Sequence, residues 1–284
     1  MSLKKIVSLL TITLLAGFIL AACGAKSDDD DAKTLKIGVM SMTESDEARW
    51  DKIEDLLESE DIDLDFVEFT EYSQPNKALA NGEVDINAFQ HYNFLNNWND
   101  ENNGDLVTIA ETYISPVHLF SGTDTSGKAK YKTVSELPDG AQIAVPNDAT
   151  NESRALYVLQ TAGLIELDVS GDELATIANI KSNPKNLDIK ELEASQTARS
   201  LISADAAIVN NSYAVPADID YETSLFKEEI NDDSKQWINI IVGQKDWEKS
   251  KKADLIKKVV EAYQTDDVKK IIEETSDGID LPVW

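Results

Sequence analysis

Short apolar runs of strand length alternate with segments of helical periodicity along most of the chain. The runs are bounded by polar or turn-forming residues, as is typical of strands in a layered protein. The strand-like runs are 35–40, 64–69, 84–89, 106–110, 142–145, 187–189, 206–209 and 237–242. Because strands that alternate with helices build layered sheets, the pattern predicts the α/β fold class.

The helix expected after residue 146 has recognisable signals at both of its ends. Asn147 or Thr150 is its expected N-cap, and Gly163 follows it at a place where glycine often ends a helix. Near the C-terminus, apolar residues repeat at helical spacing and predict a closing helix. These apolar residues are Ala253, Ile256, Val259, Val260 and Tyr263.

The first 23 residues have a different pattern from the rest of the chain. Lys4 and Lys5 precede an uncharged, mostly apolar run at 6–22, which ends in Leu-Ala-Ala before Cys23. A basic start, an apolar middle and small residues before a cleavage site are typical of a signal peptide. The Leu-Ala-Ala-Cys ending resembles the lipobox of bacterial lipoproteins. This resemblance implies that residues 1–22 are removed and that Cys23 carries lipid on its sulfur.

Two other interpretations of this leader remain open at this point. It is also compatible with an ordinary secretory signal, in which Cys23 has no special role. A transmembrane anchor is the third option, although 17 apolar residues is short for a bilayer span. Lipidation is favoured because a lone reactive thiol in an oxidising compartment would be a liability. Residues 23–33, rich in aspartate, are then expected to form a flexible acidic tether.

Composition narrows the class of partner and the number of folding units. The chain has 26 basic and 53 acidic residues, and its formal net charge is −27. Such an excess of acid repels phosphate backbones and anionic headgroups, so nucleic acid is not an expected partner. About 260 residues beyond the leader are long for one core, which favours two lobes of ordinary size.

Sequence signals of catalysis are missing. The chain contains neither a phosphate-binding G-x-x-x-x-G-K-[ST] motif nor a G-x-S-x-G nucleophile elbow. The single cysteine lies in the leader, so a cysteine nucleophile is excluded. We therefore expect no enzyme and no cofactor. His91 and His118 lack the spacing of a zinc motif, yet two histidines among many carboxylates leave a metal-binding lipoprotein of a metal importer as the alternative.

Candidate binding residues follow the ends of predicted strands, where α/β sheets bind ligands. Phe89, His91 and Phe94 place aromatic rings beside an imidazole, although a buried core pair next to a surface histidine would have the same pattern. Arg154, one turn into a predicted helix, offers a planar fork for a carboxylate, or alternatively pairs with a surface acid. Asn210 and Asn239, at the end of or within an apolar strand, need hydrogen-bond partners if buried, either from a loop or from a ligand.

Five motifs occur in an order that resembles one family. They are 71–79 (EYSQPNKAL), 88–91 (AFQH), 145–148 (VPND), 183–187 (NPKNL) and 191–194 (ELEA). Together with the lipobox, they resemble the NlpA-type methionine-binding lipoproteins, the substrate-binding components of methionine ABC importers. The resemblance runs from about Leu35 to Trp284.

The resemblance implies a two-lobed, periplasmic-binding-protein-like fold with the ligand in a cleft between the lobes. Residues 34–118 and 240–284 would form the first lobe, and 119–239 the second. The protein would be held on the extracytoplasmic face of the cell membrane by the lipid on Cys23. Its partners would be a small amino-acid ligand, an ABC permease and the ATPase of that permease.

The resemblance also implies roles for individual residues. Arg154 would bind the methionine carboxylate, with Asn210 and Asn239 near the amino and carboxylate groups. The side-chain pocket would be lined by Tyr72, Phe89, His91 and Phe94. Polarizable aromatic rings suit a thioether.

Two departures from the family pattern leave the ligand open. Phe94 stands where the family often has tyrosine, so the ring is kept and a hydroxyl donor is lost. His118, near the predicted crossover, is not expected from the family. If its ring points into the cleft, D-methionine, a methionine-containing dipeptide or another apolar amino acid becomes an alternative to L-methionine.

Overall fold

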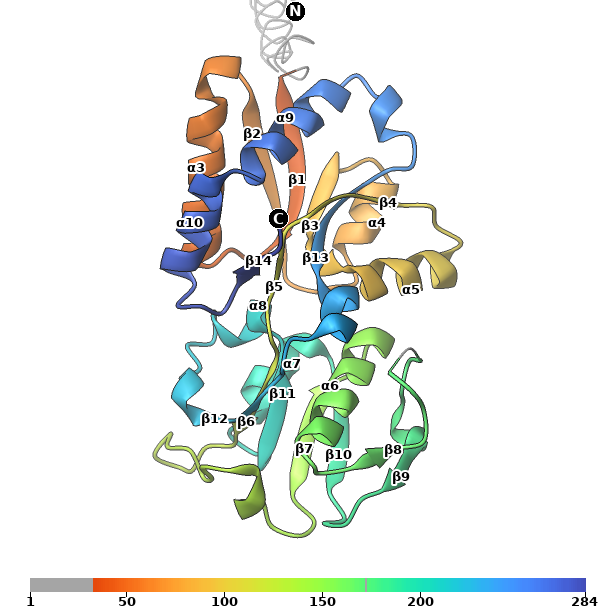
Figure 1. Ribbon diagram of the computed structural model, residues 1–284, viewed down its shortest axis with the longest axis vertical. Coiled ribbons are helices and arrows are strands. Elements are labelled where there is room, and N and C mark those ends of the chain that lie inside the picture. Colours follow the sequence, from red (N-terminus) through yellow and green to blue (C-terminus); the bar gives the residue numbers. More distant parts are fainter. Residues whose placement is uncertain (1–32, 172) are drawn as a thin grey trace, which may run out of the picture.

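The computed structural model describes residues 33–171 and 173–284, and these residues form two α/β lobes one above the other (Figure 1). The two-lobed α/β fold is the one predicted. Cys23, the leader and nearly all of the predicted tether lie outside the described residues. The predicted lobe boundaries stay a prediction.

The first lobe is built on a five-stranded sheet in the order β2-β1-β3-β13-β4. β2 and β3 run parallel to β1, whereas β13 is antiparallel to both β3 and β4. The strands are β1 (Thr34–Met40), β2 (Asp63–Phe69), β3 (Ile86–His91), β4 (Val107–Glu111) and β13 (Asn239–Gly243). Its helices are α3 (Glu44–Leu57), α4 (Pro75–Ala80), α5 (Tyr92–Asn102), α9 (Ala253–Tyr263) and α10 (Asp266–Thr275).

The second lobe repeats this arrangement with the sheet order β10-β7-β11-β6-β12. β10 and β11 are parallel to β7, and β6 is antiparallel to its two neighbours. The strands are β6 (His118–Ser121), β7 (Gln142–Pro146), β10 (Asp188–Leu192), β11 (Ala206–Val209) and β12 (Ser224–Lys227). Its helices are α6 (Ala149–Thr161), α7 (Ala194–Ser200) and α8 (Asn211–Ala214).

Short elements complete the described part of the chain. Two small antiparallel pairs are β5 (Tyr113–Ile114) with β14 (Leu281–Pro282), and β8 (Glu166–Leu167) with β9 (Ile180–Ser182). The 3₁₀ turns are Glu58–Glu60, Val134–Glu136, Ile177–Asn179, Tyr221–Thr223, Asp232–Trp237 and Trp247–Lys249.

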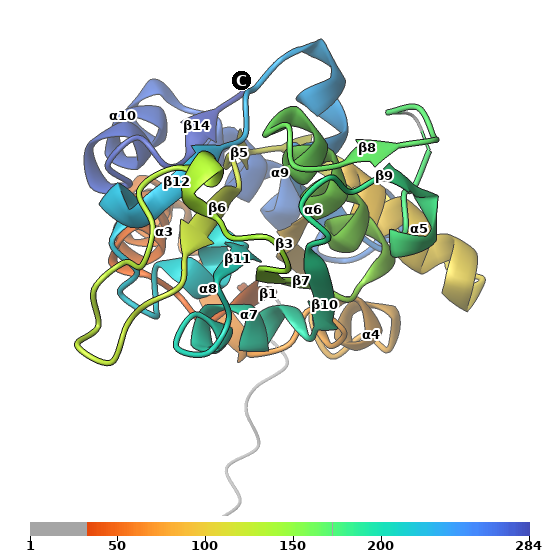
Figure 2. The same cartoon turned by 90° about the horizontal axis from the view of Figure 1, so that it is seen from below.

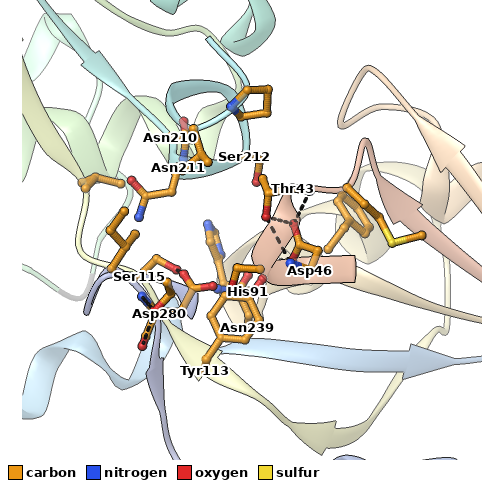
Figure 3. A pocket seen from close by; sticks show the side chains of 18 of the residues that line it. Thr43, Asp46, His91, Tyr113, Ser115, Asn210, Asn211, Ser212, Asn239 and Asp280 are labelled. Atoms are coloured by element: carbon orange, nitrogen blue, oxygen red, sulfur yellow. Dashed lines mark hydrogen bonds between the residues drawn. The ribbon is translucent and has the colours of Figure 1, made fainter. Parts of the chain in front are cut away.

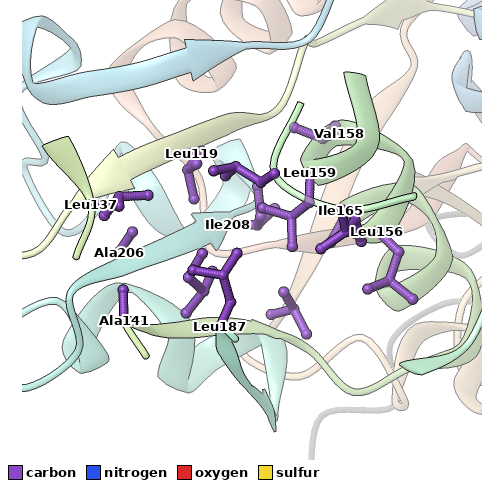
Figure 4. Packing of buried hydrophobic residues seen from close by; sticks show 14 of the residues in the cluster. Leu119, Leu137, Ala141, Leu156, Val158, Leu159, Ile165, Leu187, Ala206 and Ile208 are labelled. Atoms are coloured by element: carbon purple, nitrogen blue, oxygen red, sulfur yellow. The ribbon is translucent and has the colours of Figure 1, made fainter. Parts of the chain in front are cut away.

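Alternating residues of the second sheet are buried on opposite faces, under different helices. Leu119, Ile143 and Ile208 pack with the apolar face of α6 in the larger cluster of this lobe (Figure 4). Their neighbours Phe120 and Ala207 pack in a second cluster with residues of α7 and α8. These two helices lie on the other face of the sheet from α6 (Figure 2). Strands buried on both faces read as continuous apolar runs, which is why the sequence predicts them well.

Two crossover segments join the lobes (Figure 1). The first crossover, residues 112–117, contains β5 and leads into β6; the second crossover, residues 228–238, leads into β13. In each sheet, the antiparallel strand in the fourth position is the first strand after a crossover: β6 in the second lobe and β13 in the first. This topology fixes both crossovers to the interior of a sheet rather than to its edge.

Two local expectations are wrong. The N-cap of α6 is Asp148 rather than Asn147 or Thr150, and its carboxylate accepts from the backbone N–H of Asn151 at 3.0 Å. A carboxylate there also faces the positive end of the helix. The last predicted strand begins at Asn239 instead of Trp237, because residues 232–237 form a 3₁₀ turn with its own capping box.

We predict that Gly122→Ala destabilises the protein by about 1–3 kcal/mol, the usual cost of overpacking. A Cβ at Gly122 would overlap the backbone carbonyl oxygen of Ala204, which has no freedom to rotate away. Urea unfolding measures the effect. Gly171→Ala is the matched control, since nothing lies within 4 Å of a Cβ built there. Equal stability of the two variants would contradict the prediction.

Candidate functional site

A cavity of about 560 Å³ lies between the lobes and is lined by residues of both. All seven residues predicted to bind a ligand line it, although they come from distant parts of the chain. They are Tyr72, Phe89, His91, Phe94, Arg154, Asn210 and Asn239. The structure therefore brings together the whole predicted set at one place.

The cavity lies where parallel strands of the two sheets end. β3 ends at His91, β7 leads through Asp148 into α6, and β11 is followed directly by Asn210. Asn239 begins the antiparallel β13 and is paired in register with His91. The carboxyl ends of the parallel strands thus supply most of the polar groups, as is usual for ligand sites in α/β sheets.

Arg154 is buried in the first turns of α6 and is held by both crossovers. Its Nε donates to Oε1 of Glu228 at 3.0 Å, and its Nη2 donates to Oε2 at 2.5 Å. Nη2 also donates to the backbone oxygen of Ser115 at 2.9 Å. The guanidinium carbon lies 5.2 Å from the ring centre of Trp237, within cation–π range.

Asn210 presents an unused acceptor to the cavity. Its Nδ2 donates to Oδ1 of Asn151 at 2.8 Å, which fixes the orientation of the amide. Its own Oδ1 is buried without a protein partner. A buried carbonyl oxygen without a donor carries a desolvation cost, which a ligand N–H would remove.

His91 presents an unused donor to the same space (Figure 3). Its Nδ1 accepts from the backbone N–H of Phe94 at 3.1 Å and so caps the start of α5. Burial, with a smaller contribution from the positive charge of Arg154, lowers the pKa of His91 to about 3. The neutral ring therefore carries its proton on Nε2, which is buried near the Asn151 side chain and makes no well-aligned hydrogen bond to the protein.

Aromatic rings enclose one part of the cavity. Tyr72, Phe89 and Phe94 contact one another with ring centres 5.6–6.1 Å apart, and Tyr213 of the second lobe lies 5.0 Å from Tyr72. Burial raises the pKa of the Tyr72 hydroxyl, so this ring stays neutral. The enclosure suits an apolar, polarizable side chain.

His118 does not belong to this cavity. Its ring is buried in the second lobe, stacked 5.4 Å from Phe120 and edge-on to Tyr221, with Nδ1 2.9 Å from the hydroxyl of Ser224. Among residues 33–171 and 173–284, no group of three histidine, cysteine or acidic side chains could hold a metal ion. The metal-binding alternative that joined His91 to His118 is therefore not favoured, and His118 gives no reason to expect an unusual ligand.

Several residues beside the cavity were not singled out from the sequence. Asn151 orients Asn210, while Ser115, Glu228 and Trp237 hold Arg154. Asn151 lies in the same motif as Arg154 and three residues before it. This spacing places both residues on one face of a helix and could have identified Asn151 as a candidate. The other three lie in or beside the crossovers and carry no pattern that marks them.

Residues 35–284 match the family model described as NlpA lipoprotein. The D-methionine-binding lipoprotein MetQ of Escherichia coli strain K12 is 35% identical to this chain over 279 residues, 95% of each chain. The probable D-methionine-binding lipoprotein MetQ of Vibrio cholerae is 37% identical over 98% of each.

Solved structures agree with these relatives. The substrate binding protein of a methionine transporter from Streptococcus pneumoniae has a TM-score of 0.86 and 65% identity, over 89% of this chain and 96% of that one. A nutrient binding protein from Burkholderia cenocepacia bound to methionine has a TM-score of 0.78 and 34% identity, over 88% and 100%. Within the described part of this chain, no helix is both long and apolar enough to cross a bilayer.

The buried, neutral state of His91 predicts a pH dependence of stability. The pKa of the folded ring, about 3, lies below the value of 6.5 for an unperturbed histidine. The unfolded chain therefore takes up a proton first, and the stability contributed by neutral His91 is complete above pH 6.5 and is lost as the pH falls toward 3. Between pH 7 and pH 5 the loss should be about 2 kcal/mol.

The variant His91→Asn isolates this effect, because asparagine also caps helices but does not titrate. Other groups that titrate in the same window are common to both proteins. We expect urea unfolding to show that wild type loses about 2 kcal/mol relative to the variant between pH 7 and pH 5. Parallel pH profiles of the two proteins would mean that folding does not lower the pKa of His91.

Proposed function

Because the chain belongs to the NlpA lipoprotein family, we propose that it is a lipid-anchored, extracytoplasmic solute-binding protein that delivers methionine to an ABC importer. Among the proteins described above, one is the substrate binding protein of a methionine transporter and another is a D-methionine-binding lipoprotein. The observation that carries the proposal is the polar composition of the cavity. It presents a guanidinium, an unused acceptor and an unused donor beside an aromatic enclosure.

The polar groups suit the two ends of a zwitterion. Nη1 of Arg154 is the guanidinium nitrogen not engaged by Glu228 or Ser115, and it would donate to the α-carboxylate. Oδ1 of Asn210 would accept from the ammonium group, with the Asn239 side chain beside it. His91 Nε2–H adds a neutral donor. The ammonium and carboxylate groups of the ligand would bind favourably because they give these buried atoms hydrogen-bond partners.

The aromatic enclosure would take the thioether. Tyr72, Phe89 and Phe94 offer ring faces and edges to a soft sulfur atom, and Phe94 does so without a hydroxyl. The relatives are described as binding D-methionine or methionine, so both enantiomers belong in the first ligand screen.

Ligand binding would hold the lobes together. Contacts already cross between the lobes at the edge of the cleft: Tyr213 OH donates to the backbone oxygen of Thr70 at 3.2 Å, and Ser195 Oγ donates to Glu71 at 3.1 Å. A ligand that touches Arg154 and Asn210 on one side and His91 on the other adds to these contacts. Closure of this kind is a hinge motion about the crossovers, and no covalent bond changes.

The anchor and the transporter complete the proposal. Lipid on Cys23 would keep the protein on the extracytoplasmic face of the membrane. An ABC permease and its cytoplasmic ATPase would receive the ligand. The strongly acidic chain would gain little from anionic headgroups, so a covalent anchor accounts for its attachment better than surface charge does.

We predict that wild-type protein, freed of co-purified ligand, binds L-methionine in calorimetry and that Arg154→Ala weakens binding about 100-fold or more. Loss of one partner of a buried charge pair typically costs this much. Arg199→Ala is the matched control, because Arg199 is exposed on α7 away from the cavity. Thermal unfolding checks that both variants are folded. Near wild-type affinity in Arg154→Ala would contradict the assigned role.

The anchor has its own test. We predict that Cys23→Ser abolishes metabolic labelling with radioactive palmitate in a bacterial host and releases the protein from the membrane fraction. Purified Cys23→Ser protein should bind methionine as tightly as wild type, because none of the residues proposed to bind the ligand lies in the leader or the tether. Continued membrane association of the unlabelled variant would instead support a transmembrane leader.

A further inference from the structure

The buried pair of Arg154 and Glu228 has a consequence for ligand affinity. The side chains are only 5% and 11% exposed, so the two charges are largely desolvated. Glu228 does not line the cavity, whereas Arg154 does. The carboxylate therefore lies behind the guanidinium as seen from a ligand.

Glu228 occupies the better edge of the guanidinium. An arginine has five N–H donors, and a carboxylate binds most strongly across two of its nitrogens. Here Nε and one N–H of Nη2 bind the two oxygens of Glu228, and the other N–H of Nη2 binds the Ser115 oxygen. A ligand is left with the two N–H groups of Nη1.

The position of Glu228 is itself fixed by the first crossover. Its backbone N–H donates to the oxygen of Val117 at 2.9 Å, and its Oε2 accepts from the N–H of Val117 at 3.0 Å. Glu228 thus joins the second crossover to the first, and Arg154 joins both to α6. The carboxylate has little freedom to move away when a ligand arrives.

We infer that Glu228 is a built-in counter-ion of Arg154 that competes with the carboxylate of the ligand and thereby limits its affinity. The inference rests on the proposed function, in which Arg154 binds that carboxylate. In the empty cleft, Glu228 compensates the buried positive charge. In the liganded cleft, two carboxylates share one guanidinium, so the ligand gains less than it would from an uncompensated arginine.

Glu228 also positions Arg154, and the two effects have opposite signs. Loss of positioning would weaken binding, whereas loss of the competing charge would strengthen it. Arg154 has two further restraints, the hydrogen bond to Ser115 and the ring of Trp237, and little of its side chain is exposed. A glutamine would still accept one of the bonds from the guanidinium. The charge effect therefore dominates in Glu228→Gln.

The decisive experiment compares two ligands of different charge. L-methionine carries a carboxylate, while L-methioninol carries a neutral hydroxymethyl group in its place and is a cation. Removing the negative charge of Glu228 should strengthen the binding of L-methionine and weaken the binding of L-methioninol. A variant that merely damages the site would weaken both ligands.

We expect Glu228→Gln to bind L-methionine about tenfold more tightly than wild type and to bind L-methioninol more weakly. Calorimetry measures the affinity for L-methionine. The affinity for L-methioninol is measured by competition, in which millimolar L-methioninol displaces the ligand bound to each protein or L-methionine displaces L-methioninol. Unchanged or weaker binding of L-methionine by the folded variant overturns the inference.

Two further variants complete the design. Glu229→Gln removes the same charge from the exposed neighbouring residue and should leave both affinities unchanged. Glu228→Asp keeps the charge but draws it back by one methylene, so the preference for L-methionine over L-methioninol should rise by less than in Glu228→Gln. If Glu228→Gln does not fold, this variant decides, and a preference that stays the same or falls overturns the inference. Failure of wild type to bind L-methionine would instead contradict the proposed function.

Discussion

The buried positive charge of Arg154 is the constraint around which the cleft is organised. A guanidinium removed from water must be paired and hydrogen-bonded, or it destabilises the fold by several kcal/mol. Its partners are Glu228 on the second crossover and Ser115 on the first, and the arginine itself lies in the second turn of α6 in the second lobe. One side chain therefore joins both connections between the lobes to the helix that faces the cavity.

The sheet topology makes this junction effective. Each crossover continues into an antiparallel strand in the interior of the sheet it enters, β6 in one lobe and β13 in the other. β13 begins at Asn239, opposite His91, so the second crossover also delivers a residue directly to the cavity wall. A change of conformation in the crossovers would consequently move residues that line the cavity in both lobes, which is the coupling that a closing cleft requires.

The limits of sequence interpretation can be seen at individual residues. The strands β1, β7 and β11 are predictable because they are buried on both faces and read as apolar runs. The carboxyl ends of β3, β7 and β11 lead to His91, Arg154 and Asn210, and the family resemblance adds roles to these positions. Glu228 could not be predicted. It is one of 53 acidic residues and lies 74 positions from Arg154, so only the folded chain shows which acid is the partner.

Local competition explains the smaller errors. Asn147, Asp148 and Thr150 are all residue types that often cap helices, so the sequence does not show which one is the N-cap. In the structure Asp148, two residues after the end of β7, has the extended backbone of an N-cap. His118 illustrates the converse. Its type suggested chemistry, but an alternating strand places it on a face covered by aromatic rings, where it is a packed core residue.

The overall charge of the protein favours the same ligand class as the cavity does. With a formal charge of −27, the molecule repels anions from a distance, and the cleft offsets this only locally through Arg154. Because Glu228 already compensates that arginine, the site has no surplus positive charge with which to attract an acidic solute. A zwitterion has no net charge to be repelled and brings its own ammonium group to the free oxygen of Asn210. The long-range field and the short-range contacts thus both select a neutral amino acid over an acidic one.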